Sequence, residues 1–292
     1  MGTQKYNIAL LISGNLGYTV LLHLVKRFNI TAIFTDRKST NIIDFSNQNK
    51  VPVFIGNPRN NKSLEFAEKL NIDIILSINY LFIIEKGLIN LAKKYAVNFH
   101  GSLLPKYRGR TPHVWAIING EKQTGITAHI LTEGLDAGPI LEQVIIPISD
   151  TDTGFTILEK YYEYYPSLVD KVLENIEINE PYEQDSTLAT YFSKREPEDG
   201  KIIWDWHKER IYNWIRALAK PYPGAFFYHN FKKKVVHSSN YNSLGFKDTD
   251  ANGLILAIEE DGIIIKTSNG AMKLFEIEDY NKNDFQIGEI VE

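Results

Sequence analysis

Three polar side chains near the middle of the chain have the types and the spacing of an acyl-transfer site. Asn98 and His100 stand two residues apart at the end of a predicted strand, so their side chains point to the same face. A histidine is the usual general acid or base near neutral pH, and an asparagine amide can donate a hydrogen bond to a developing oxyanion. Asp136 follows in a turn between Gly134 and Gly138, where its carboxylate can orient a histidine or keep it protonated. The set predicts acyl transfer through a tetrahedral intermediate.

The composition favours acyl transfer without a covalent enzyme intermediate. The chain of 292 residues has 0 cysteines, which excludes a thiolate nucleophile and fits a reducing compartment. No serine lies in a nucleophile-elbow motif. One alternative is a metal-dependent hydrolase that uses His100, His129 and Asp136, although His129 lies in an apolar predicted strand, where it is expected to pack or to support the site from behind. Another is a structural role, with Asp136 as an ordinary turn residue.

Alternating strands and helices place Asn98 and His100 at the edge of a parallel sheet. Short apolar runs predict strands over residues 7–12, 30–35, 51–55, 72–78 and 95–100. Apolar residues at helical spacing predict helices over residues 16–28 and 61–70. This alternation is typical of a Rossmann-like α/β fold with a mainly parallel sheet. Ligands of such sheets bind beyond the carboxyl ends of the strands, which is where both side chains lie.

The turn that carries Asp136 is predicted to lie between two further strands. Thr111 and Pro112 predict the start of a helix, with Thr111 as its N-cap and Gly120 after its end. The further predicted elements are strands over residues 126–131 and 140–148 and a long, tyrosine-rich helix over residues 153–176. We expect this helix to pack on the sheet or to form a subunit contact rather than to present its tyrosines as a stacking platform.

A smaller domain is predicted after the catalytic one. Residues 191–200 are polar and charged and predict a linker. The further signals are a helix over residues 206–219 and hairpin turns at Asp261-Gly262 and Asn269-Gly270. We therefore predict a catalytic domain over residues 1–195. Residues 196–292 are predicted to form a helix and a small antiparallel, mostly β (OB-like) domain.

Two features of the first half partly match a dinucleotide site. Residues 13–17 (Ser-Gly-Asn-Leu-Gly) follow the first predicted strand, and Asp36 ends the second. Two glycines three residues apart do not complete the G-x-G-x-x-G fingerprint. We interpret the segment as a strand-to-helix turn and Asp36 as a cap residue, and we predict no NAD.

Charge and hydropathy argue against two classes of partner. The net charge is -4, whereas nucleic-acid binding depends on clustered positive charge, so we expect no nucleic acid. The N-terminal residues resemble no secretory signal, and Tyr6 does not fit the myristoylation pattern. The longest apolar tract, residues 72–84, is too short to span a bilayer. We expect a cytoplasmic protein without a membrane partner.

Two stretches resemble the folate-dependent formyltransferase family. They read N-F-H-G-S-L-L-P-K-Y-R-G-R-T-P over residues 98–112 and G-I-T-A-H-I-L-T-E-G-L-D-A-G-P-I-L over residues 125–141. The resemblance implies N10-formyltetrahydrofolate as the formyl donor, an amine as the acceptor and no metal. It implies that Asn98 and protonated His100 stabilise the oxyanion while Asp136 helps to remove the amine proton. The implied folate-binding residues are Tyr80, Leu81, Phe82, Ile84, Gly134 and Asp136.

The acceptor side resembles the sugar-nucleotide branch of the family. Arg110, Arg195 and Tyr222 are the residues that this resemblance implies for nucleotide binding, with Tyr222 stacking on the base and Arg195 near the pyrophosphate. The implied acceptor is a dTDP-4-amino-4,6-dideoxyhexose for lipopolysaccharide O-antigen synthesis, and UDP-linked 4-amino-arabinose is the next candidate. The alternatives are a methionyl-tRNA formyltransferase and a non-catalytic Rossmann-like ligand-binding module. The family also implies a homodimer.

Overall fold

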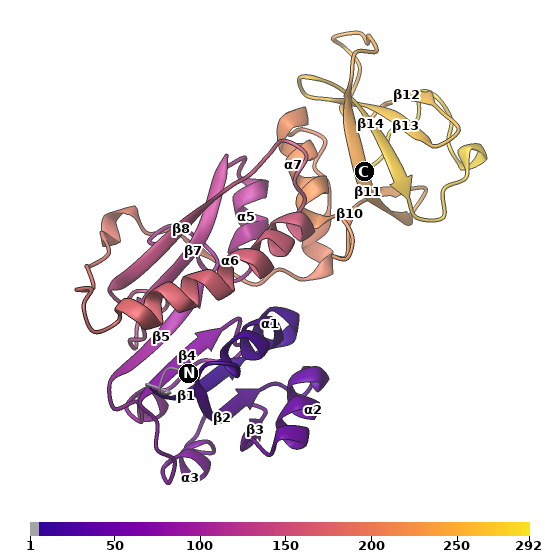
Figure 1. Cartoon of the computed structure of the whole chain (residues 1–292). Helices are drawn as coiled ribbons and strands as arrows, with labels where there is room; N and C mark the ends of the chain where they lie inside the picture. The colour runs from indigo at the N-terminus through magenta and orange to yellow at the C-terminus, as the bar shows by residue number, and fades with distance from the viewer. Residues whose placement is uncertain (1–5) are drawn as a thin grey trace. The chain divides into compact units, whose positions relative to one another are not determined.

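The computed structural model describes residues 6–292, which form two compact units (Figure 1). The first unit contains residues up to 110 together with 124–146 and 160–192, and the second contains 111–123, 147–159 and 193–292. Compactness does not test which stretches fold independently, so the division into domains 1–195 and 196–292 stays a prediction. The prediction about an N-terminal signal falls largely on residues 1–5, which lie outside the described residues. Within residues 6–292, no helix has the length and apolar character needed to cross a membrane.

The first unit is built on a mixed, mainly parallel sheet, as predicted. The strand order is β3-β2-β1-β4-β5-β7-β8. Neighbouring strands from β3 to β5 pair in parallel, whereas β7 runs antiparallel to β5. The strands are β1 (Asn7–Ile12), β2 (Asn29–Thr35), β3 (Val53–Ile55), β4 (Ile74–Ile78), β5 (Tyr95–His100), β7 (Gln123–Ile130) and β8 (Ile140–Pro147). Both β1 and β4 are buried almost throughout because parallel strands are covered on both faces.

The helices of this half depart from the prediction in more than one place, and the short helix over residues 86–89 was not predicted. The first four are α1 (Gly14–Leu24), α2 (Thr40–Asn49), α3 (Leu64–Ala67) and α4 (Lys86–Ile89). Helix α2 was not predicted, because its sequence is polar and only Ile42 and Ser46 are buried. The predicted helix over residues 61–70 shortens to α3, because Asn60 and Asn61 have φ angles of 62° and 60°, which are incompatible with a right-handed helix.

The long helix α6 (Gly154–Asn175) packs on the sheet, as expected. Tyr161 and Tyr165 are buried, and their hydroxyls donate to the backbone carbonyls of Gly101 (2.6 Å) and Phe99 (3.3 Å). A Cβ at Gly101 would lie 2.7 Å from the Tyr161 ring, so only glycine fits there. The helix thereby fixes the end of β5, which carries Asn98 and His100.

A short pair of strands corrects the predicted linker. Residues 191–200 begin with β9 (Tyr191–Phe192), which pairs in parallel with β6 (Arg108–Gly109) in the loop after His100. They end in the 3-10 helix η2 (Pro197–Gly200), and another, η1 (Ser186–Leu188), precedes β9. The polar composition of the segment concealed this pairing, because β9 contributes only backbone groups and two aromatic rings to it.

The second unit holds the five-stranded antiparallel sheet that the hairpin signals predicted. Its strand order is β10-β11-β14-β13-β12. The strands are β10 (Ala225–His229), β11 (Lys232–Asn242), β12 (Ile255–Ile258), β13 (Gly262–Thr267) and β14 (Gly270–Ile277), followed by the 3-10 helix η3 (Lys282–Asp284). Strands β13 and β14 pair from Thr267 and Gly270 onward, so the predicted turn at Asn269-Gly270 is confirmed. The unit also contains α5 (Pro112–Ile118) and α7 (Lys208–Leu218).

The start of α5 was predicted correctly, but the capping was not. The helix begins at Pro112 and is followed by Gly120, which has a φ angle of 72°. Thr111 makes no side-chain cap hydrogen bond and has φ 46° and ψ 50°. An N-cap residue normally has extended backbone, so the left-handed conformation of Thr111 rules out the expected side-chain cap.

Candidate active site

Strand pairing places Asn98 beside His129 and fixes the hydrogen-bonding roles of both. The two residues face each other across β5 and β7, and the Asn98 amide nitrogen lies 3.1 Å from Nε2 of His129. Nδ1 of His129 lies 2.9 Å from the carbonyl oxygen of Ile130. A carbonyl can only accept, so Nδ1 carries a hydrogen, and in the neutral ring Nε2 accepts from Asn98. His129 therefore orients the Asn98 amide.

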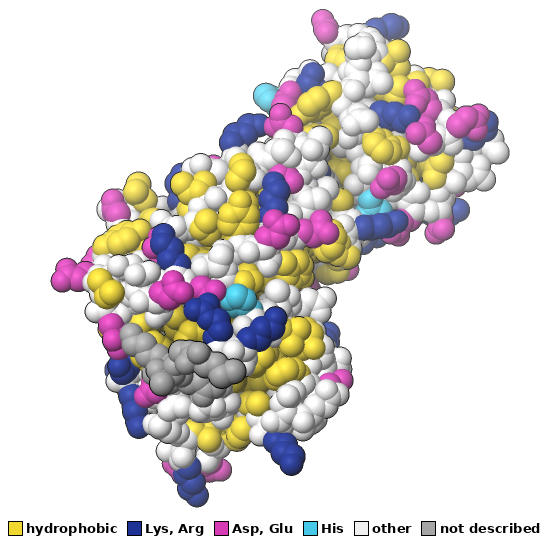
Figure 2. Space-filling model, in the orientation of Figure 1, with side chains coloured by type: hydrophobic (Ala, Val, Ile, Leu, Met, Phe, Trp, Pro, Cys, Tyr) yellow, Lys and Arg dark blue, Asp and Glu magenta, His cyan; other side chains and the backbone are white. Residues whose placement is uncertain are grey.

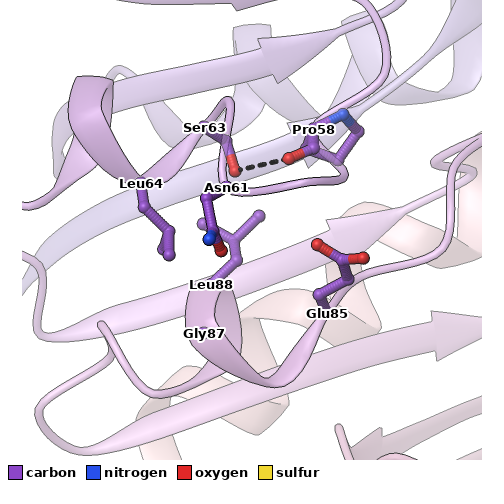
Figure 3. A pocket seen from close by; sticks show the side chains of 7 residues that line it. All are labelled: Pro58, Asn61, Ser63, Leu64, Glu85, Gly87 and Leu88. Carbon is purple, nitrogen blue, oxygen red and sulfur yellow. Dashed lines mark hydrogen bonds between the residues drawn. The ribbon is translucent and has the colours of Figure 1, made fainter.

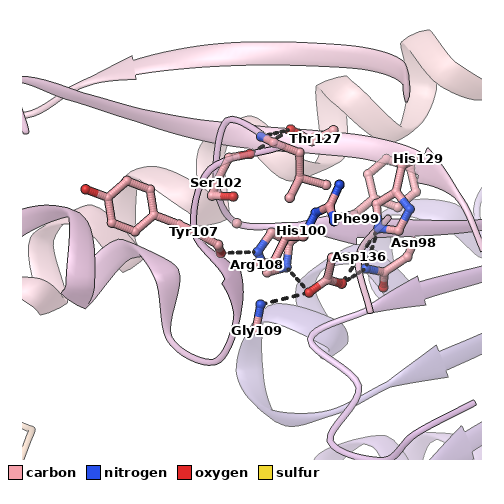
Figure 4. Close-up of polar contacts among 12 residues, drawn as sticks. Asn98, Phe99, His100, Ser102, Tyr107, Arg108, Gly109, Thr127, His129 and Asp136 are labelled. Atoms are coloured by element: carbon pink, nitrogen blue, oxygen red, sulfur yellow. Dashed lines mark hydrogen bonds and ion pairs between the residues drawn. The ribbon is translucent and has the colours of Figure 1, made fainter. Parts of the chain in front are cut away.

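Asp136 lies within reach of both residues of the predicted pair (Figure 4). Its Oδ1 is 3.4 Å from the Asn98 amide nitrogen, and its Oδ2 is 3.6 Å from Nδ1 of His100. The backbone N–H of Gly109 donates to Oδ2 at 2.9 Å. Because a carboxylate can only accept, the nitrogen of the Asn98 amide must face it. The structure thus brings together the three residues that the sequence singled out.

The Asp136 carboxylate is held in its charged form. Burial by itself would raise its pKa, since only 13% of the side chain is exposed. The positive charge of His100 and the hydrogen bond from the Gly109 N–H act in the opposite direction and lower the pKa well below its ordinary value. Asp136 is therefore a carboxylate at every pH at which a protein of this kind works.

One carbonyl fixes the ring of His100. Its Nε2 lies 2.8 Å from the carbonyl oxygen of Tyr107, so Nε2 carries a hydrogen and donates it. The other nitrogen, Nδ1, is the one that faces Asp136. Tyr107 has a φ angle of 62°, a left-handed conformation that turns its carbonyl toward the ring. His100 is 7% exposed, so the residues packed around its side chain restrict the orientation of the ring.

Hydrogen bonds to Thr127 of β7 hold the loop that follows His100. The Thr127 hydroxyl donates to the carbonyl of Ser102 at 2.7 Å and accepts from the backbone N–H of Leu104 at 3.1 Å. Gln143 of β8 donates to Thr127 Oγ1 and to the carbonyl of Leu104. The loop is therefore anchored to the sheet on both sides of its turn.

The residues expected at a folate site line two neighbouring segments. Of the segment after β4, Tyr80 and Ile84 pack against the core, whereas Leu81 is 43% exposed. Phe82 lies with its ring at 5.5 Å from that of Tyr80, whose hydroxyl is buried and has no hydrogen-bond partner among residues 6–292 and whose pKa is raised by burial. The second segment is the turn with Gly134 and Asp136.

One contact joins these two segments to each other, and a second ties the first of them to the loop after His100. Lys86 forms an ion pair of 3.4 Å with Glu133 of the Asp136 turn. Arg110, one of the residues expected at the sugar nucleotide, donates to the carbonyl of Leu81 at 2.8 Å. The guanidinium of Arg110 is therefore placed beside the expected folate segment.

Arg195 and Tyr222, the other residues expected at the sugar nucleotide, lie in the second unit. The Arg195 guanidinium lies over the rings of Trp115 (5.3 Å) and Trp214 (5.6 Å). Burial lowers its pKa. The Tyr222 hydroxyl is 2.9 Å from Nε2 of His113. Both side chains are thus committed in part to packing within their own unit.

The segment that partly matched a dinucleotide fingerprint has the contacts of a strand-to-helix turn. The Asp36 carboxylate accepts from the Ser39 hydroxyl (2.6 Å) and from the backbone N–H of Lys38 (2.8 Å). Ser39 Oγ accepts in turn from the backbone N–H of Gly14. A Cβ at Gly17 would lie 2.8 Å from Cβ of Ile12, so this glycine is required by packing. The turn is closed by its own hydrogen bonds.

Neither a small cavity of the first unit nor a cluster of metal ligands within residues 6–292 marks a different site. A cavity of about 20 Å³ in the first unit has room for roughly one water molecule (Figure 3). Its lining residues are Pro58, Asn61, Ser63, Leu64, Glu85, Gly87 and Leu88. Over residues 6–292, no group of three or more His, Cys, Asp or Glu side chains has an arrangement that could hold a metal ion. The trio of His100, His129 and Asp136 is no exception.

Sequence reasoning left the role of one residue of the site open and missed two others. His129 was expected either to pack or to support the site, and its pairing opposite Asn98 gives it the supporting role. Gly109 contributes a backbone N–H, which no residue type reveals. Gln184 donates to the carbonyls of Asp136 and Gly138 from 48 and 46 residues away, a contact without any local signal.

Comparison with known families matches both halves of the chain. A family model described as "Formyl transferase" matches residues 7–173, and one described as "Formyl transferase, C-terminal domain" matches residues 194–292. The methionyl-tRNA formyltransferase of Caldicellulosiruptor saccharolyticus is 36% identical over 219 residues, which cover 75% of this chain and 70% of that protein.

Two further similar proteins differ in how much of them this chain covers. The bifunctional polymyxin resistance protein ArnA of Wigglesworthia glossinidia brevipalpis is 38% identical over 244 residues, 80% of this chain but only 37% of ArnA. The crystal structure of an N-formyltransferase from Helicobacter canadensis, in complex with folinic acid and dTDP-3-aminofucose, has a TM-score of 0.74 at 21% identity. It covers 93% of this chain and 99% of that one, and it establishes the likeness of the fold.

Proposed function

The chain belongs to the formyl transferase family, and we propose that it transfers a formyl group from N10-formyltetrahydrofolate to the amine of a nucleotide-linked amino sugar. The observation that carries the proposal is the convergence of Asn98, His100 and Asp136 at the carboxyl end of β5. These side chains supply an amide donor, an imidazole and an ionised carboxylate around one point, which is the set that amine formylation needs.

The reaction follows from the groups present. The acceptor amine attacks the formyl carbon, and the carbonyl oxygen becomes an oxyanion. The Asn98 amide donates to this oxyanion with the hydrogen that otherwise makes the long, 3.4 Å bond to Asp136, while His129 holds the other hydrogen. Protonated His100 stabilises the same charge through Nδ1, because Nε2 is engaged by Tyr107.

Proton transfer completes the exchange. The Asp136 carboxylate takes the proton that the attacking amine releases. The bond between the formyl carbon and N10 then breaks, and N10 leaves with the proton that Asp136 took from the amine, so one N–C bond forms, one breaks and Asp136 is a carboxylate again. No step passes through a metal. The chain's own contribution is to orient the groups and to keep Asp136 charged, which its lowered pKa favours.

We place the folate against the two segments that the resemblance implied. Leu81, Ile83 and Leu135 are 43%, 60% and 59% exposed, so both segments present apolar side chains to solvent. A flat ring system can cover these side chains while its polar edge meets backbone groups of Tyr80–Ile84 and of the turn with Gly134 and Asp136. This supports folate binding at Tyr80, Leu81, Phe82, Ile84, Gly134 and Asp136.

The acceptor we propose is an amino-sugar nucleotide rather than a tRNA. The net charge is -4, and Figure 2 shows basic and acidic side chains interspersed on one face of the molecule. A tRNA surface would need clustered cations. The Helicobacter canadensis protein, described with dTDP-3-aminofucose, supports a dTDP-linked amino sugar. We take a dTDP-4-amino-4,6-dideoxyhexose for lipopolysaccharide O-antigen synthesis as the first candidate, with Arg110, Arg195 and Tyr222 toward the nucleotide.

The test is a formylation assay with N10-formyltetrahydrofolate against a panel of amino-sugar nucleotides, dTDP- and UDP-linked, and methionyl-tRNA. We expect turnover with an amino-sugar nucleotide and none with the tRNA. Formylation of the tRNA alone would overturn the proposed acceptor in favour of the second candidate, which the 36% identity to a methionyl-tRNA formyltransferase favours. We also propose that residues 1–195 form the catalytic domain and that the protein is a cytoplasmic homodimer.

Two controls separate catalysis from other functions. His100→Ala should abolish turnover and retain folate binding, whereas a pure ligand-binding module would show no turnover to lose. Activity that survives EDTA is expected, and its loss would favour a metal-dependent reaction.

A further inference from the structure

Gln184 holds the backbone of the turn that carries Asp136. Its side-chain nitrogen donates to the carbonyl oxygens of Asp136 (2.9 Å) and Gly138 (2.7 Å). Asp136 has a φ angle of 49°, a left-handed conformation that is unfavourable for a residue with a Cβ unless its surroundings hold it. Two carbonyls fixed by one amide keep the chain in this conformation and therefore keep the carboxylate where it meets His100.

Arg108 holds Gln184 in turn. Nη2 of Arg108 donates to Oε1 of Gln184 at 2.7 Å, and Nη1 donates to the hydroxyl of Tyr191 at 2.7 Å. Arg108 is 3% exposed, and within residues 6–292 no ion pair with a carboxylate is formed by it. A buried guanidinium whose donors go to an amide and a phenol serves to fix geometry, because it neutralises no acid.

These contacts close a ring around Asp136. Arg108 reaches the Asp136 backbone through Gln184, while the next residue, Gly109, donates its N–H to the Asp136 carboxylate at 2.9 Å. The pairing of β6 with β9 holds Arg108 and Gly109 against Tyr191 and Phe192. The carboxylate and the backbone of one residue are thus held by two adjacent residues of the loop after His100.

We propose that Gln184, fixed by Arg108, is a positioning residue for Asp136. The inference rests on the function proposed above, in which Asp136 takes part in the reaction. The segment 182–192, which the sequence presents as an approach to a linker, is then part of the framework of the site. Gln184 is partly buried although the residues on both sides of it are exposed, which fits a side chain directed inward for its contacts.

The test is a double-mutant cycle between Gln184 and Asp136, measured as single-turnover rates with the enzyme in excess. Gln184→Met keeps the length of the side chain and removes both donors. We expect it to lower the rate by roughly tenfold to a hundredfold, as a misplaced catalytic group does, and to change KM for the folate by less than about twofold. In an Asp136→Asn background the same change should have no further effect, because the group it positions is already lost.

The Gln184→Glu variant distinguishes the contact between Gln184 and Arg108 from the contacts between Gln184 and the turn. Its carboxylate still accepts from Arg108, but it cannot donate to the carbonyls of Asp136 and Gly138. We expect a loss as large as that of Gln184→Met. Asp136→Glu provides a second background with a measurable rate, and Gln48→Met, on the exposed side of α2, is the matched control with an unchanged rate and thermal midpoint.

Three results would overturn the inference: a wild-type rate for Gln184→Met, a rate loss that multiplies with that of Asp136→Asn, or restoration by Gln184→Glu. Each leaves the proposed function intact as long as Asp136→Asn is itself strongly impaired. A wild-type rate for Asp136→Asn would instead refute the role proposed for Asp136.

Discussion

The side-chain amide of Asn98 lies 3.1 Å from Nε2 of His129, and the two residues face each other across β5 and β7. His129 is 1% exposed and uses its other ring nitrogen on the backbone. Although His129 lies in an apolar strand, its Nε2 is thus an acceptor for one partner, the amide of Asn98. This contact decides which of the two amide hydrogens of Asn98 remains for a substrate.

Removing the acceptor of His129 should impair Asn98 without unfolding the strand. His129→Phe keeps an aromatic ring of similar volume but leaves the amide of Asn98 free to turn. We expect the turnover rate to fall about tenfold, less than the roughly 100- to 1,000-fold expected for Asn98→Ala, which removes the oxyanion donor itself. His129→Gln offers an acceptor oxygen and should retain more activity. A wild-type rate for His129→Phe would mean that His129 only packs.

The lowered pKa of Asp136 makes the first unit sensitive to acid. An ordinary aspartate has a pKa of about 3.9, and the folded state holds that of Asp136 below it. As the pH falls, the unfolded chain binds the proton first, so the stabilisation is complete above about pH 5 and is lost as the pH falls through and below about 4. The difference in unfolding free energy between wild type and Asp136→Asn should therefore shrink between pH 6 and pH 3 in urea titrations followed by circular dichroism. A constant difference would contradict this.

We expect that Gly109 cannot be replaced without loss of stability and turnover, and Gly56 serves as the control for the cause. Gly109 has a φ angle of 104°, and a Cβ there would collide with the carbonyl oxygen of Phe192. Gly56 has a φ angle of 112° and no atom within 4 Å of such a Cβ. Gly56→Ala should cost only the backbone strain of roughly 1–2 kcal/mol, whereas Gly109→Ala should cost more and also lower turnover, because the Gly109 N–H binds Asp136. Equal thermal midpoints and equal rates for the two variants would argue against the collision.

His113 should make the second unit less stable at mildly acidic pH. Burial lowers its pKa to about 4, below the ordinary value of 6.5, so the unfolded state binds a proton between these pH values and the folded state does not. Stability should fall by up to about 3 kcal/mol as the pH drops from 6.5 to 4, and His113→Gln should remove this dependence. The 4 tryptophans of the chain, Trp115, Trp204, Trp206 and Trp214, all lie in the second unit, so fluorescence in urea reports on that unit alone. A pH dependence that persists in His113→Gln would assign the effect to another group.

The sequence by itself determined the fold class and the identity of the reacting groups. Short, mainly apolar runs such as Ile8–Ile12 and Ile74–Ile78, set between helical patterns, indicate buried strands of a parallel sheet, and both are such strands. The alternation of side chains along residues 95–100 sets Asn98 and His100 on one face, because the period of a strand is two residues. The motifs over residues 98–112 and 125–141 also carry the family, which the match of the family model over residues 7–173 establishes.

Only the tertiary structure decided how those groups are held. The contacts of His129, Gly109 and Gln184 depend on strand register, on a backbone N–H and on a side chain 48 residues away from Asp136. None of these has a local sequence pattern, because a backbone group has the same chemistry in every residue and a distant partner leaves no spacing to read. The left-handed conformations of Tyr107 and Asp136 likewise arise from the contacts around them rather than from residue preference. The sequence thus predicts which groups react, and the pairing of the chain's segments determines how those groups are oriented.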